Sequence, residues 1–155
     1  MRALGLDIGQ VRIGVALSDP LCLTAQGLES YERIGIKKDT SYLVELMKKY
    51  QVSLVVSGLP LGLSGMDTDQ TRTVRDFVKR LENKARSSGI KAEFVFMDER
   101  FTTNIASQVL IQADVSRGDR KKVVDKMAAT VILQGYLDKN RKREAPEDSI
   151  HRESR

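Results

Sequence analysis

MRALGLDIGQVRIGVALSD, residues 1–19, contains two short apolar runs separated by a glycine-containing turn. Residues 2–7 and 11–17 have the length and composition of strands, and the turn at Gly9 predicts that they pair as an antiparallel hairpin. Asp7 ends the first run, where a buried carboxylate costs desolvation free energy unless a partner compensates it. One explanation is local, because Asp favours turn geometry. The other is a functional role for a carboxylate at the end of a strand.

The rest of the chain extends this hairpin into a larger sheet. A third strand is expected within residues 21–34 and would complete an antiparallel meander. The elements expected after it are a helix at 39–51 capped by Asp39 or Thr40, a strand at 53–60, a helix from Asp67 to about 87, a strand at 92–97, a helix from Thr102 or Thr103 to about 112, a basic loop at 113–122 and a helix at 123–138. This order predicts an α/β fold with a mixed five-stranded sheet, three antiparallel strands plus two parallel, flanked by helices. Ligand sites in such sheets gather at the carboxyl ends of the parallel strands.

Length and hydropathy indicate one domain and no membrane segment. The chain has 155 residues, which predicts a domain at 1–138 followed by a charged, disordered tail at 139–155. No stretch approaches the roughly 18 apolar residues of a membrane span. The first residues resemble a strand rather than a signal peptide, so we expect a cytoplasmic protein without a membrane partner.

The rarest side chains exclude several kinds of chemistry. The only cysteine is Cys22 and the only histidine is His151, close to the C-terminus. An internal disulfide, a cysteine-rich zinc site and a Ser-His-Asp or Cys-His mechanism are therefore excluded. Cys22 lies in the apolar stretch PLCLTA, typical of a small buried hydrophobic residue. Any catalysis must depend on carboxylates, Lys, Arg, hydroxyls or a metal held by oxygen.

The charge of the chain permits an anionic partner without requiring one. The formal net charge is +5, and a mixed solvated surface explains this excess equally well. Aromatic residues make up only 5% of the chain and Trp is absent, which disfavours nucleic-acid binding dominated by base stacking.

Acidic residues lie at three places that such a sheet would bring together. Asp7 ends the first strand, Asp98 and Glu99 end the last strand, and Asp125 opens the last helix on its apolar face. Each has a structural explanation: a turn for Asp7, an ion pair with Arg100 for Asp98 and Glu99, and the helix dipole for Asp125. Crowded carboxylates also raise one another's pKa, and a hard divalent cation such as Mg²⁺ relieves that repulsion. Two such ions support phosphodiester hydrolysis without any histidine.

Four motifs in the right order resemble one protein family. LGLDIGQVRIGVALSD, VVSGLPLGLSG, FMDERFTT and VVDKMAATVILQGYL are similar to the YqgF/RuvX family, and the match spans residues 2–138. The resemblance implies an RNase H-like fold. Members are described as Holliday junction resolvases or as nucleases that mature the 16S rRNA precursor.

The resemblance also implies a catalytic set. The expected catalytic residues are Asp7, Glu99 or Asp98, and Asp125, with Asp7, Glu99 and Asp125 as metal ligands. Glu99 is favoured over Asp98 with little to separate them. The cofactor would be Mg²⁺ or Mn²⁺.

Several further residues are candidates for substrate binding. The set is Gly9, Arg12, Arg100, Arg120, Lys121 and Lys122. Gly9 would let a phosphate or metal approach the backbone. Arg12 is either a phosphate ligand or an exposed strand residue, and Arg100 either binds phosphate or holds a carboxylate. The basic residues before Asp125 either contact a phosphate backbone or form a solvated cluster, and residues 62–65 either cradle a strand or form a plain turn.

The sequence therefore predicts a metal-dependent endonuclease, a hydrolase of ester bonds, acting on structured RNA or branched DNA. Processing of the 5′ end of the 16S rRNA precursor is the first hypothesis, and resolution of Holliday junctions is the second. An ATPase of the actin-like or sugar-kinase class is disfavoured, because it needs two such domains and a second Asp-x-Gly loop. A non-catalytic RNA- or ribosome-binding module is the alternative of a different class. The sequence does not distinguish a monomer from a homodimer.

Overall fold

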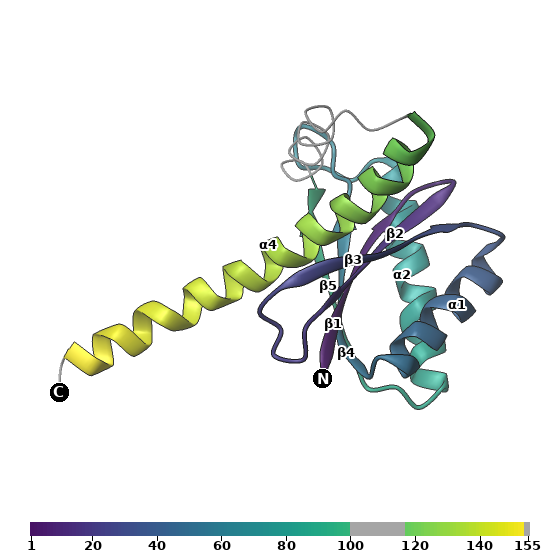
Figure 1. The fold of residues 1–155 in the computed structure, drawn as a ribbon. Coiled ribbons are helices and arrows are strands. Elements are labelled where there is room, and N and C mark those ends of the chain that lie inside the picture. Colours follow the sequence, from purple (N-terminus) through teal and green to yellow (C-terminus); the bar gives the residue numbers. More distant parts are fainter. Residues whose placement is uncertain (100–116, 154–155) are drawn as a thin grey trace.

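Five strands form one mixed sheet in the computed structural model (Figure 1). The structure describes residues 1–99 and 117–153, with the side chains of 1–99 and 121–141. The strands are β1 (Arg2–Ile8), β2 (Arg12–Ser18), β3 (Ala25–Glu32), β4 (Val52–Leu59) and β5 (Glu93–Asp98), and the helices are α1 (Ile36–Lys49), α2 (Asp69–Ser87) and α4 (Arg117–Glu153). Their order in the sheet is β3-β2-β1-β4-β5.

The pairing of the strands matches the topology that the sequence predicts. β1 pairs antiparallel with β2, and β2 pairs antiparallel with β3. β1 pairs parallel with β4, which pairs parallel with β5. The prediction of three antiparallel strands plus two parallel ones is confirmed. The carboxyl ends of β1, β4 and β5 consequently lie at one end of the sheet.

Helices cover both faces of this sheet, as Figure 1 shows. α1 and α2 pack on one face, where Leu43, Phe77 and Leu81 join the larger core cluster. α4 packs on the other face through Ala129, Ile132 and Leu133. Because strand residues alternate between faces, each strand sends every second side chain toward α4.

Glycines let α4 lie close to the sheet. A Cβ on Gly14 would lie 2.0 Å from the backbone oxygen of Asp125, and a Cβ on Gly5 would lie 2.7 Å from Cβ of Leu133. Real Cβ atoms do not approach other atoms this closely, so a larger residue at Gly14 or Gly5 would push the helix outward. The close approach places residues 125–133 of α4 over β1 and β2.

Several predicted boundaries were wrong. β3 lies within the expected 21–34, but α1 begins at Ile36 rather than 39. Residues 117–122 are helical rather than a loop, because the helix starts before its apolar face begins. The last helix runs to Glu153, past the expected end at 138, because the Lys, Arg and Glu residues there are favourable helix formers.

The domain boundary at 138 and the disorder of the tail at 139–155 stay predictions. The helix expected between Thr102 or Thr103 and 112 lies outside the described residues.

Candidate active site

Asp7 lies on the face of the sheet that α4 covers. In β1, Leu4, Leu6 and Ile8 belong to the core under α1 and α2, whereas Ala3 packs in the cluster under α4. Strand alternation places Asp7 on the same face as Ala3. Asp7 pairs with Gly14 of β2, the glycine against which the backbone of Asp125 packs.

Glu99 meets Asp7 at this end of the sheet. Burial and a hydrogen bond with Asp7, together with the charges of Asp7 and Asp98, raise the pKa of Glu99 to about 9. Gly58 of β4 provides the space, because a Cβ there would lie 2.2 Å from Oε1 of Glu99. The two carboxyl groups therefore share a partly buried site in which they cannot both ionise without a compensating positive charge.

Asp98 points away from this pair. Val95 and Met97 pack under α4, whereas Phe94 packs against the opposite core, so alternation turns Asp98 toward the α1–α2 face. Of the two adjacent acids, Glu99 is the one that contacts Asp7.

Asp125 packs its backbone against Gly14, which pairs with Asp7, but its carboxylate has partners of its own. Its Oδ2 accepts a hydrogen bond from Nε of Arg12 at 2.7 Å and one from the hydroxyl of Ser30 at 2.9 Å. Arg12 is therefore neither an isolated phosphate ligand nor a plain exposed residue, since it forms an ion pair that ties β2 to α4. Among the residues that the structure describes, no group of three or more Asp, Glu, His or Cys is arranged to hold a metal ion.

The remaining described candidates for substrate binding lie in the β1–β2 turn and near the start of α4. Gly9 forms the tight turn, where its N–H donates to the carbonyl of Arg12 at 2.9 Å and a Cβ would lie 2.8 Å from that oxygen. The turn itself therefore requires glycine at position 9, because a Cβ would collide with the backbone. Lys121 and Lys122 are exposed near the start of α4, and Arg120 lies in the same helix. Arg100 lies outside the described residues.

A buried carboxylate next to the turn was not expected from the sequence. Asp39 was interpreted as a helix cap, but it is completely buried and its Oδ2 accepts from Nε of Arg33 at 2.9 Å. The amides of Ile34 and Gly35 and the hydroxyl of Tyr31 donate to its Oδ1. Burial by itself would raise the pKa of Asp39, but these hydrogen bonds outweigh it and the pKa is lowered.

Arg33 links this network to the β1–β2 turn. Its Nη1 donates to the carbonyl of Gly9 at 2.9 Å, and its guanidinium lies over the ring of Phe77. No local pattern signals this role, because the partners of Arg33 come from the turn and from both helices of that face. The side chain therefore braces the turn that follows Asp7.

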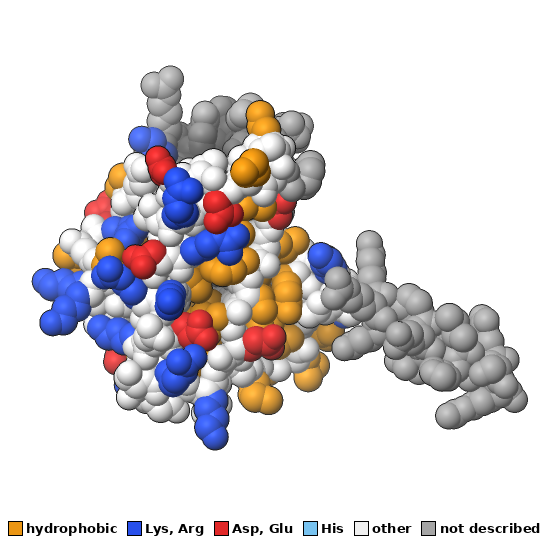
Figure 2. All heavy atoms as spheres, turned by 180° about the vertical axis from the view of Figure 1, so that it is seen from behind, with side chains coloured by type: hydrophobic (Ala, Val, Ile, Leu, Met, Phe, Trp, Pro, Cys, Tyr) orange, Lys and Arg blue, Asp and Glu red, His pale blue; other side chains and the backbone are white. Residues whose placement is uncertain are grey.

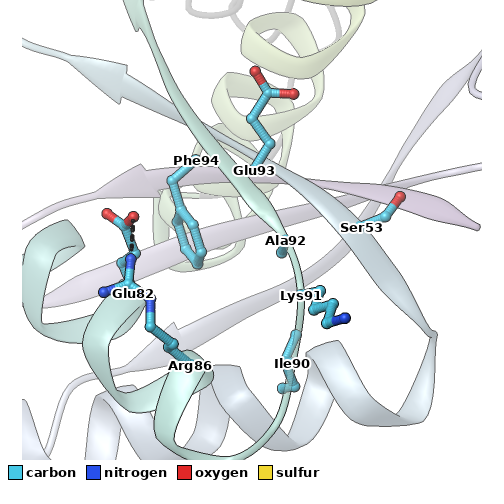
Figure 3. A pocket seen from close by; sticks show the side chains of 8 residues that line it. All are labelled: Ser53, Glu82, Arg86, Ile90, Lys91, Ala92, Glu93 and Phe94. Carbon is cyan, nitrogen blue, oxygen red and sulfur yellow. Dashed lines mark hydrogen bonds and ion pairs between the residues drawn. The ribbon is translucent and has the colours of Figure 1, made fainter.

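A hollow of about 410 Å³ lies at the opposite end of the sheet. Figure 3 shows it beside the start of β5. Ser53 and Glu93 line it near the starts of β4 and β5, and Glu82 and Arg86 of α2 form an ion pair across its rim. It contains none of the acids discussed above.

The chain is similar to known proteins over nearly its whole length. A family model described as "RuvX: Holliday junction resolvase" matches residues 1–139. A relative from Desulforamulus reducens named "Putative pre-16S rRNA nuclease" is 48% identical over 142 residues, which cover 92% of this chain and 100% of the relative. One of the same name from Clostridium novyi is 46% identical, covering 89% of this chain and 98% of the relative.

Solved structures share the fold at low sequence identity. A fowlpox virus resolvase bound to Holliday junction DNA has a TM-score of 0.57 at 13% identity, covering 90% of this chain and 98% of that one. T. thermophilus RuvC in complex with a Holliday junction has a TM-score of 0.53 at 10% identity, covering 85% and 91%. Among the described residues, no helix has the length and apolar character needed to cross a membrane.

Proposed function

The chain belongs to the RuvX family, and from that premise we propose that it is a metal-dependent nuclease that hydrolyses phosphodiester bonds in structured nucleic acid. The observation that carries the proposal is the contact between Asp7 and Glu99 at the carboxyl end of the parallel strands. We propose the 5′ end of the 16S rRNA precursor as the substrate, since the relatives at 44–48% identity carry the name pre-16S rRNA nuclease. Holliday junction resolution is the second candidate, favoured by the description of the matching family model.

The acid pair suits a divalent cation. Two carboxyl groups in contact, one with its pKa raised to about 9, form a site that a hard cation with a preference for carboxylate oxygen would stabilise. Asp7 and Glu99 would hold Mg²⁺ or Mn²⁺, with Asp125 as a further ligand. Bound there, two such ions would activate the attacking water and stabilise the leaving oxygen of the phosphodiester.

Asp125 and Arg12 would act as a linked pair. Nε of Arg12 donates a hydrogen bond to Oδ2 of Asp125, which fixes the orientation of this carboxylate. The Arg12 side chain is 25% exposed, so its outer guanidinium nitrogens can bind a phosphate while Nε keeps Asp125 in place. The exposed Lys121 and Lys122 near the start of α4 would add contacts with the phosphate backbone.

The proposal is tested by Asp7→Asn in the full-length protein. Purified wild type and variant are incubated with a 16S rRNA precursor fragment and with a four-way DNA junction, each with Mg²⁺ and with Mn²⁺. We expect the variant to lose more than about 100-fold in cleavage rate, since even residues that only support metal ligands are worth about 10- to 100-fold. Asp76→Asn, an exposed acid on α2 paired with Arg80, is the matched control.

The outcome separates the alternatives. Unchanged cleavage by Asp7→Asn would show that the active site is elsewhere. No cleavage by the wild type, with binding that survives Asp7→Asn and weakens steeply with salt, would support the non-catalytic binding module. A mass measurement in solution beside the assay tests for a homodimer, which paired nicks in a junction would require.

A further inference from the structure

The loop between β4 and α2, residues 60–68, exposes two large apolar side chains. Leu63 is fully exposed, and Met66 is 70% exposed. Single apolar residues on a surface need no explanation. Two exposed apolar side chains on one short loop beside the proposed active site do need an explanation, provided that the loop holds them in a fixed position.

Hydrogen bonds give this loop a defined shape. The N–H of Gly62 donates to the carbonyl of Met66 at 2.9 Å, and the N–H of Gly65 donates to the carbonyl of Gly62 at 2.8 Å. Leu61 and Asp67 form an antiparallel bridge at its base. Gly65 has a φ of 81°, a conformation that glycine adopts without strain. The loop is therefore a small hairpin with Leu63 and Met66 near its tip.

Side chains of α2 fix this hairpin to the body of the protein. Arg75 binds both carboxylate oxygens of Asp67, at 2.9 and 3.2 Å. The hydroxyl of Thr71 donates to the carbonyl of Pro60, and Thr68 caps the helix. A loop ordered before binding loses little conformational entropy when its tip contacts a partner.

The hairpin starts at the acid pair. Gly58 of β4 contacts the carboxylate of Glu99, and Leu59 pairs with Asp98 in β5. Pro60 follows directly, so the loop leaves the sheet at the end where Asp7 and Glu99 meet. A nucleic acid with its scissile phosphate at these acids would have neighbouring nucleotides close to the hairpin.

The chemistry of the hairpin and its surroundings suits such nucleotides. Proteins that distort nucleic acids insert Leu and Met side chains between base steps and partly unstack them. Arg72 and Arg75 lie in the first turns of α2 beside the hairpin, where their partly exposed side chains form ion pairs with Asp69 and Asp67. Figure 2 shows further Lys and Arg side chains, with Asp and Glu side chains among them, on the face seen from behind.

We propose that the 60–68 hairpin is a wedge whose Leu63 and Met66 side chains insert against an unstacked base at a branch point or helix end of the bound nucleic acid. This inference rests on the proposed nuclease function and adds the way in which the site selects distorted substrates over continuous duplex. The scarcity of aromatic residues fits an aliphatic wedge rather than a stacking platform.

The test replaces both tip residues in the full-length protein. The double variant Leu63→Ser with Met66→Ser is compared with wild type and with a control that carries Leu21→Ser and Leu23→Ser. The control residues are exposed apolar side chains of the β2–β3 loop, at the opposite end of the sheet. Because all four side chains are exposed to solvent, we expect both variants to unfold at the wild-type midpoint.

Two probes carry the fluorescent base 2-aminopurine at a distorted position. One is a four-way DNA junction labelled at its branch point, and the other is a 16S rRNA precursor hairpin labelled at the end of its helix. On binding wild type or control, we expect 2-aminopurine fluorescence to rise as the base unstacks. The wedge variant should lose this rise and bind roughly 10-fold more weakly. Its salt dependence should match wild type, because no phosphate contact is removed.

Each outcome bears on the inference. A fluorescence rise that only one probe shows, and that the wedge variant loses, supports the wedge and identifies RNA or DNA as its partner. Equal fluorescence and affinity in wedge variant and wild type would overturn the wedge while leaving the nuclease intact. A wedge variant that changes only the oligomeric state would assign the hairpin to protein contact instead. Failure of the wild type to bind either probe would overturn the nuclease and the wedge together.

Discussion

Asp39, which is completely buried, and Glu99, which is partly buried, have opposite electrostatic environments. Asp39 receives hydrogen bonds from Arg33, from Tyr31 and from two backbone amides, and its pKa is lowered. Glu99 is buried against Asp7, with Asp98 nearby, and its pKa is raised to about 9. The first arrangement stabilises the fold, whereas the second opposes folding unless a proton or a cation is bound. This difference fits a structural role for Asp39 and the metal-binding role that we propose for Glu99.

Removing the partner of Asp39 should produce the largest effect on stability. Arg33→Ala leaves a completely buried carboxylate without its ion pair, and we expect the free energy of unfolding to fall by about 3–5 kcal/mol. Urea unfolding at pH 7 measures this loss. Arg80→Ala, which removes an exposed pair with Asp76, should cost less than about 1 kcal/mol. Equal losses in the two variants would mean that Asp39 does not depend on Arg33.

Asp39 and Glu99 should contribute with opposite signs to the change of folding stability with pH. Asp39 stabilises the fold above its ordinary pKa, and this stabilisation is lost as the pH falls. Glu99 keeps its proton in the folded state up to about pH 9, so stability falls as the pH rises from 5 toward 9, by up to about 1.4 kcal/mol per pH unit. Urea unfolding in EDTA tests this decline. Glu99→Gln should flatten it, and parallel profiles for variant and wild type would contradict the assigned environment.

Mg²⁺ should stabilise the fold through the Asp7–Glu99 pair and not through the Asp39 network. A cation held by Asp7 and Glu99 stabilises the folded state by about 1.4 kcal/mol at ten times its dissociation constant. The rise should be larger at pH 8 than at pH 6, because Glu99 must release its proton to bind metal. Urea unfolding with MgCl₂, against NaCl of equal ionic strength, measures the effect. The same rise in Asp7→Asn would place the cation elsewhere.

Gly58→Ala should change stability less than the loss of Arg33 or the binding of Mg²⁺. The new Cβ would lie 2.2 Å from Oε1 of Glu99, the end of a flexible side chain, so we expect Glu99 to turn away at a cost of about 1 kcal/mol. Without contact to Asp7, the decline of stability above pH 5 should flatten and the effect of Mg²⁺ should disappear. Gly35→Ala is the control, since no atom lies within 4 Å of its added Cβ. A Gly58→Ala protein that keeps the wild-type pH profile would show that Gly58 does not set the position of Glu99.

Much of the fold follows from local patterns in the sequence. Apolar runs and turn residues predict each described strand, and the order of the elements predicts the mixed sheet that the structure confirms. Boundaries were less predictable at α1, because a helix that starts at Ile36 buries Asp39 through contacts with Tyr31 and Arg33, which no helical periodicity reveals. At α4 the helix begins in a basic segment that has no apolar face to mark it.

The sequence by itself determined which chemistry is available: acids at the ends of two strands and at one helix, a single histidine in the terminal segment, and the order of elements that gathers the acids. Only the tertiary structure decided that Glu99 rather than Asp98 contacts Asp7, and that Asp125 is held by Arg12 and Ser30. The roles of these acids in catalysis stay a prediction. The physical reason is the sequence separation of the interacting residues. Strand and helix patterns depend on residues that are neighbours in the sequence. The partner of a carboxylate, by contrast, depends on which face it occupies and on glycines such as Gly14 and Gly58 that let distant segments approach.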